Sequence, residues 1–264
     1  MTWLIALSAI LHREALRFLG QRGRLVAALV RPLVWLFIFA AGFRAALGLS
    51  ITPPYQTYIT YETYILPGLL GMICLFNGMQ SSLSLVYDRE TGSMRLLLTA
   101  PLPRLWLLFG RLLASTLVSL LQCAIFLAIA AAWGIRAPVA GYFAVLPALL
   151  LAGLMLGALG LMLSSLNRQL ENFAGVMNFV IFPMFFLSSA LYPLWKLRES
   201  GAEIVWYLAM ANPFTHAIEL IRFAAYGELS WMSLGVVVGC TVVFFVLAAI
   251  GYNPQGAIRT IKRG

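Results

Sequence analysis

Long apolar stretches separated by short polar ones dominate the chain, and they predict a set of membrane-spanning helices. Most of these stretches reach the roughly 20 residues that a helix needs to cross the hydrocarbon core of a bilayer. Polar and apolar residues do not alternate within them, which excludes a transmembrane β-barrel. We therefore predict an all-α polytopic membrane protein with six transmembrane helices. The predicted spans are residues 32–49, 64–86, 105–133, 139–166, 173–191 and 231–252.

Two stretches outside these spans have patterns of their own. In residues 1–24, apolar side chains fall on one helical face, which is typical of an amphipathic helix lying in the membrane interface; a solvated tail is the alternative. Residues 192–230 contain two apolar stretches that are too short or too charged to span a bilayer, with Asn212 and Pro213 between them. Short apolar segments broken by proline indicate re-entrant helices that enter the membrane from one side.

Composition agrees with a membrane protein. Of the 264 residues, 62% are hydrophobic and only 10% are charged, whereas a soluble domain carries about 25% charged residues. The net charge is +9, but the basic residues flank the apolar spans and form no separate basic domain. We therefore expect them to orient the protein and contact membrane lipids, and we expect no nucleic-acid partner.

The distribution of basic residues predicts the orientation. Six spans place both termini on one side of the membrane. If that side is the cytoplasm, five of the 18 lysines and arginines lie outside: Arg44, Arg136, Lys196, Arg198 and Arg222. The majority then lies inside, so the positive-inside rule favours a bacterial cytoplasmic (inner) membrane protein with both termini cytoplasmic. Residues 87–104 become a cytoplasmic loop, and residues 192–230 become an external segment.

The sequence offers little chemistry of its own. It contains no Walker glycine loop, no Gly-x-Ser-x-Gly elbow, and no metal-ligand spacing among its histidines and cysteines. The centres of the predicted spans lack the Asp, Glu, Lys and His side chains on which a proton-driven carrier usually depends. We therefore predict a non-catalytic subunit that binds no cofactor or metal and takes its energy from a partner.

The loop of residues 87–104 is the one dense run of charges between two long apolar segments. Asp88 fits the N-cap of a short helix and Glu90 its first turn, while Met94 and Leu98 contribute to an apolar ridge. Such a helix, lying parallel to the membrane, would pass force from a soluble partner to the spans. A solvated connector is the alternative.

Two motifs resemble those of a known family. The stretch from Asp88 to Arg104, DRETGSMRLLLTAPLPR, resembles the signature loop of type-2 ABC (ATP-binding cassette) transporter permeases. The stretch from Asn212 to Arg222, NPFTHAIELIR, resembles their late motif. The resemblance is closest to the branch that includes nodulation-factor and drug-resistance exporters, and it covers nearly the whole chain.

The resemblance implies partners and roles for particular residues. Two permease copies, or one copy and a paralogue, would form the pathway as a dimer above two separate P-loop ATPase subunits, which bind the ATP and Mg. The helix of residues 1–24 would help to seat the ATPase. The implied ATPase-coupling residues are Asp88, Arg89, Glu90, Gly92, Met94, Arg95 and Leu98. The implied external gate consists of Asn212, Pro213, His216, Glu219 and Arg222.

Within that gate, Glu219 and Arg222 are spaced i,i+3, so we expect them to pair on one helix face. His216 lies three residues before Glu219 and is a candidate third member. An ion pair on a helix surface, without any role in gating, is the alternative.

Aromatic and amide side chains in the first and fifth spans are candidates for the pathway wall, because the resemblance places these spans against the partner permease. They are Trp35, Phe39, Phe43, Asn178 and Phe182. Ordinary packing or lipid contact is the alternative. An aromatic wall suits a lipid-linked, glycan or amphipathic drug-like cargo. We therefore predict an ABC exporter permease; the rivals are a secondary carrier or channel, an intramembrane transferase and a purely structural subunit.

Overall fold

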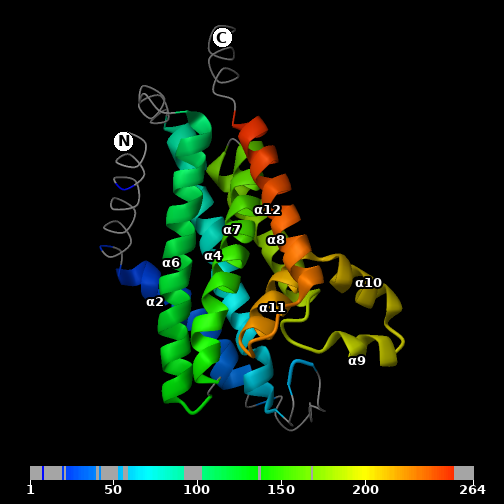
Figure 1. The fold of residues 1–264 in the computed structure, drawn as a ribbon. Helices are drawn as coiled ribbons and strands as arrows, with labels where there is room; N and C mark the ends of the chain where they lie inside the picture. Colours follow the sequence, from blue (N-terminus) through cyan, green and yellow to red (C-terminus); the bar gives the residue numbers. More distant parts are fainter. Residues whose placement is uncertain are drawn as a thin grey trace, which may run out of the picture.

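Helices make up all the regular structure in the described part of the chain (Figure 1). The computed structural model describes residues 8, 20, 22–39, 42, 53–55, 59–91, 103–135, 138–167 and 169–252. The all-α class predicted from the sequence is confirmed over these residues.

Four helices are long and apolar enough to cross a membrane. They are α4 (Tyr61–Glu90), α6 (Arg104–Ala132), α7 (Val139–Leu166) and α12 (Trp231–Gly251). They lie side by side along the length of the bundle (Figure 1) and correspond to the second, third, fourth and sixth predicted spans. Helix α7 packs against the other three and is apolar on every face, as expected of a helix buried among neighbours.

The crossing of α4 and α7 brings two backbones together. A Cβ added to Gly78 would lie 3.0 Å from the backbone of Gly157, and one added to Gly160 would lie 2.7 Å from the carbonyl oxygen of Gly78. Glycine is required here because a larger side chain would push the helices apart.

The first and fifth predicted spans correspond to shorter apolar helices. Helix α2 (Arg22–Val34) runs into a π-helical turn, η1 (Trp35–Phe39), and α8 covers Leu170–Phe186. The sequence places the start of the first span at residue 32, but α2 begins ten residues earlier and Pro32 lies inside it. A proline in a helix interior removes a backbone hydrogen bond, and the helix changes to π-helical geometry within one turn of it.

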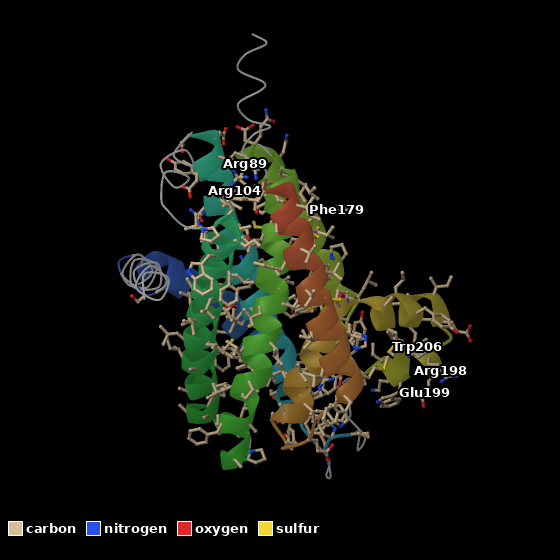
Figure 2. The ribbon with its side chains drawn as sticks, turned by 45° about the horizontal axis from the view of Figure 1, so that its top comes forward. Arg89, Arg104, Phe179, Arg198, Glu199 and Trp206 are labelled. Atoms are coloured by element: carbon tan, nitrogen blue, oxygen red, sulfur yellow. The ribbon has the colours of Figure 1, made fainter. Side chains whose placement is uncertain are left out.

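The predicted external segment of residues 192–230 contains three short helices. They are α9 (Leu194–Glu199), α10 (Glu203–Ala211) and α11 (Pro213–Ala224). Helices α9 and α10 project to one side of the bundle, as Figures 1 and 2 both show. Helix α11 instead packs against α4, α7 and α12 and is buried along its length. Gly71 of α4 makes room for it, because a Cβ there would lie 3.2 Å from Phe214.

Candidate functional site at the end of helix α4

The predicted charged loop begins inside a helix. Helix α4 continues to Glu90, so Asp88, Arg89 and Glu90 form its last turn. The prediction that Asp88 caps a new helix is therefore wrong. Arg89 and Glu90 are good helix formers, and all three side chains find partners on neighbouring helices, which extends α4 beyond its apolar stretch. The other predicted coupling residues, Gly92, Met94, Arg95 and Leu98, lie outside the described residues.

Asp88 joins α4 to α6. Its carboxylate accepts a hydrogen bond from the Arg111 guanidinium, forming an ion pair in which the side chains are only 22% and 15% exposed. Because the pair is largely sheltered from water, removing either partner would leave an uncompensated charge.

Arg89 joins α4 to the C-terminal end of α7. Its Nη1 donates to the carbonyl oxygens of Ser165 and Asn167, both at 3.1 Å, and lies 3.4 Å from that of Ser164. The last carbonyl groups of a helix have no partner within the helix, and a cation there also interacts favourably with the helix dipole. Helix α7 has no basic residue in its own last turn. Arg89 therefore supplies the cap that α7 lacks.

Glu90 joins α4 to the N-terminal end of α8. The backbone N–H of Leu170 donates to Glu90 Oε2 at 3.3 Å. The N-cap residue of α8, Gln169, makes no capping hydrogen bond with its side chain. A carboxylate at a helix N-terminus is favoured by the free N–H groups and by the dipole.

We call these three residues the α4 junction. Successive residues of a helix point about 100° apart, so three in a row can reach three different neighbours. Here they reach α6, α7 and α8. Figure 2 shows Arg89 at the end of the bundle where Arg104 begins α6. A displacement of the end of α4 would therefore move α6, α7 and α8 together.

Asn212 fastens α11 to the other end of α8. Its Oδ1 accepts from the N–H of Phe214 and caps α11, with Pro213 at the first helical position. Its Nδ2 donates to the carbonyl oxygens of Met184 at 2.8 Å and Leu187 at 2.6 Å. The predicted gate residue Asn212 is thus a connector between two helices.

Glu219 and Arg222 form the predicted ion pair on α11. Arg222 also donates to the carbonyl oxygen of Ser189 at 2.8 Å, and its guanidinium lies 4.3 Å from the centre of the Tyr64 ring of α4. His216 does not join this pair. Its Nε2 lies 3.0 Å from the carbonyl oxygen of Met210 and holds the start of α11 to α10 instead.

Tyr55 adds a neutral phenol beside this ion pair. Its ring packs edge-on against Tyr226 with the centroids 4.8 Å apart. Burial raises the pKa of Tyr55 to about 12, so the hydroxyl keeps its proton. The described structure therefore brings the Glu219–Arg222 pair together with Tyr55 and Tyr64, which the sequence analysis did not single out.

Some predicted lining residues lie together. Trp35 packs edge-on against Phe185 and Phe186 of α8, with centroids 5.5 and 6.1 Å apart. Phe182 stacks on Phe186 and is half exposed. Asn178, one turn earlier, is exposed. Phe43 and the side chain of Phe39 lie outside the described residues.

Comparison with known proteins identifies the family. Residues 5–226 match the family model described as "ABC-2 type transporter". The chain belongs to this family. It is 28% identical over 235 residues to the "Putative transport permease ycf38" of Porphyra purpurea, covering 85% of this chain and 75% of the relative. It is 31% identical over 217 residues to the protein of the same name in Cyanophora paradoxa, covering 79% and 69%.

A bacterial relative is also similar. The "Probable multidrug ABC transporter permease YbhR" of Escherichia coli K12 is 29% identical over 171 residues, which cover 64% of this chain and 45% of the relative. The chain is therefore an ABC transporter permease subunit with a multi-pass membrane location. Membership of the family implies association with ATP-binding subunits.

Proposed function

We propose that this permease is the transmembrane subunit of an ATP-driven exporter, forming the translocation pathway as a dimer with two separate ATPase subunits. The observation that carries the proposal is the α4 junction, because it links the start of the family's coupling segment to three helices. The chain itself has no sequence feature for using ATP. A permease whose helices are already linked at the α4 junction can be moved by ATP hydrolysis on a partner subunit.

Helix α8 would carry the movement across the membrane. Glu90 holds its N-terminal end and Asn212 holds its C-terminal end. Asn212 also caps α11, and Arg222 of α11 contacts Tyr64 near the start of α4. A displacement at the cytoplasmic end of α4 would thus reach the predicted external gate through α8. This route requires no chemical step in the permease.

The proposal includes six spans with both termini in the cytoplasm, the two shorter helices α2 and α8 belonging to the first and fifth spans. It also includes a lipid-linked, glycan or amphipathic drug-like cargo. The exposed aromatic side chains of α8 beside Trp35 support an amphipathic cargo, because large apolar rings accommodate chains or ring systems.

The test is permease-stimulated ATP hydrolysis by the complex in nanodiscs. Glu90→Arg places a cation at the N-terminus of α8, and Gly92→Pro removes a backbone donor from the coupling segment. We expect each to lower stimulation at least about tenfold, equivalent to roughly 1.4 kcal/mol, while leaving membrane insertion intact. Glu203→Arg, on the exposed start of α10, is the matched control. Full stimulation in both test variants would overturn the proposed coupling role.

A further inference from the structure

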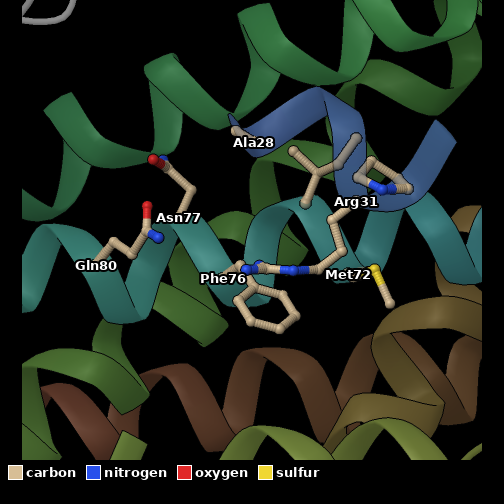
Figure 3. A pocket seen from close by; sticks show the side chains of 8 residues that line it. Ala28, Arg31, Met72, Phe76, Asn77 and Gln80 are labelled. Atoms are coloured by element: carbon tan, nitrogen blue, oxygen red, sulfur yellow. The ribbon is translucent and has the colours of Figure 1, made fainter. Parts of the chain in front are cut away.

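Arg31 lies at half the height of the bundle. Its guanidinium carbon is 3.7 Å from the centre of the Phe76 ring of α4, and Figure 3 shows the guanidinium lying over that ring. Phe76 is in the middle of α4, a 30-residue helix, so it is about 22 Å from either end at 1.5 Å per residue. The sequence analysis treats Arg31 as a residue flanking the first span and misses this position.

A cation at this depth is costly in lipid, and such residues usually face a cavity, a pathway or a counter-charge. The described acidic residues give Arg31 no counter-charge. Four of them lie at helix ends: Glu62, Asp88, Glu90 and Glu171. The other described acidic residues belong to α9, α10, α11 or the turn that follows α11. Arg31 is nevertheless exposed, so its charge is available to a ligand.

Helix α4 presents a polar stripe next to Arg31. Most of α4 is buried, but one of its faces is accessible to solvent. This face carries Phe76, Gln80, Ser84 and Tyr87. Arg31, Phe76 and Gln80 line one pocket (Figure 3). Beyond Phe76, the stripe carries an amide, a hydroxyl and a phenol from half-height to the cytoplasmic end of α4. Arg31 stands at its inner end.

The stacked geometry selects an oxyanion. Phe76 covers one face of the guanidinium, so the N–H groups remain directed outward in its plane. This fork matches the two oxygens of a phosphate, sulfate or carboxylate. One helical turn further, Trp35 and the exposed rings of α8 offer an apolar surface.

We propose that Arg31, assisted by Gln80, binds the oxyanion group of an amphipathic cargo whose apolar part lies against Trp35 and α8. This inference rests on the proposed export function and specifies the cargo class. Gln80 is four residues from Phe76, so its amide lies on the Arg31 side of α4 and can donate to the same oxyanion.

The experiment uses the complete complex with its ATPase in nanodiscs of phosphatidylcholine, without nucleotide. The probe is dodecyl phosphate carrying a diazirine on its chain, and dodecyl glucoside with the same diazirine is the neutral comparison. We expect phosphate-dependent labelling of α2, α4 or α8 that falls about tenfold in Arg31→Gln and is only partly retained in Arg31→Lys, because lysine keeps the charge but lacks the guanidinium fork. Arg198→Gln is the matched control, because Arg198 also stacks on an aromatic ring, that of Trp206, but on α9.

A second variant tests the site without removing the arginine. Gln80→Glu provides Arg31 with a carboxylate from its own chain, so it should reduce labelling to the level of Arg31→Gln. An excess of inorganic phosphate that abolishes labelling would identify a free anion as the ligand, whereas persistent labelling identifies the headgroup of the amphiphile.

Equal labelling by the two probes, or full labelling in Arg31→Gln or Gln80→Glu, would overturn the inference. Because labelling is measured without nucleotide, its failure is distinct from failure of the export proposal. That proposal is judged by permease-stimulated ATP hydrolysis in the same wild-type preparation.

Discussion

At the scale of single residues, the charged side chains of this permease connect helices within the chain. The family resemblance assigns Asp88, Arg89 and Glu90 to contact with an ATPase, yet each has a partner on another helix of the same subunit. The two assignments are compatible in our proposal, which assigns contact with the ATPase to residues 92–102, directly after the junction in the sequence. The junction residues would then transmit to α6, α7 and α8 the movement that the ATPase imposes on that segment.

The Asp88–Arg111 pair is best tested by exchanging its charges. Asp88→Arg or Arg111→Asp alone leaves two like charges in a sheltered place, and we expect each to cost about 2 kcal/mol, between surface and buried pairs. The double exchange should recover most of this loss. The thermal unfolding midpoint of the purified permease measures it. If the double variant is no more stable than the singles, the pair does not hold α4 to α6.

At the scale of elements, α8 has 17 residues, at the lower end of the length that a membrane span needs. It is fastened at both ends by other helices. Its N-terminal end receives Glu90 and its C-terminal end receives Asn212. Helix α11 is equally dependent on its neighbours, since nearly all its faces are buried. These elements are held by tertiary contacts more than by their own helix propensity.

A series of substitutions at Asn212 separates capping from connection. Asn212→Asp keeps an oxygen that can accept from Phe214 but loses the donor to Met184 and Leu187. Asn212→Ala loses both, so it should also lose about 1 kcal/mol of capping energy. We expect both variants to lower the stimulation of ATP hydrolysis by the permease.

The measurement compares ATPase stimulation with thermal stability in the two variants. Asn212→Asp should unfold at a higher temperature than Asn212→Ala while showing the same defect in stimulation. Normal stimulation in Asn212→Asp would show that the amide donor is dispensable and would remove α8 from the proposed route.

At the scale of the whole molecule, a permease without its own energy source should be inert alone. We expect no flux of the dodecyl phosphate probe in liposomes that contain only this chain. Measurable movement of the probe should require the ATPase and ATP. Robust flux from the permease alone would favour the rival function, a secondary carrier or channel.

The N-terminal residues provide a second test at this scale. The amphipathic pattern of residues 1–24 predicts an interfacial helix that helps to seat the ATPase. Deleting residues 2–21 should therefore weaken co-purification of the ATPase subunits while leaving the helices from α4 onward intact. Unchanged co-purification, at equal permease yield, would contradict a seating role.

The sequence analysis predicts correctly those features that depend on local properties of the chain. The long spans and the Glu219–Arg222 pair depend on transfer into lipid or on spacing along one helix, both of which are local properties. The extension of α4 to Glu90 and the cap that Arg89 supplies to α7 depend on neighbours distant in the sequence, such as Arg111 and Ser165. No local pattern could therefore have indicated them.

The sequence by itself determined that this protein is a helical membrane permease of the ABC-2 family, because apolar length and two motifs are read directly from the chain. Apart from the Glu219–Arg222 pair, only the tertiary structure decided what the charged residues contact. Arg89 caps a helix 75 or more residues away, and Arg31 meets Phe76 at half-height. Such contacts depend on which helix faces meet, and that follows from packing of the whole bundle.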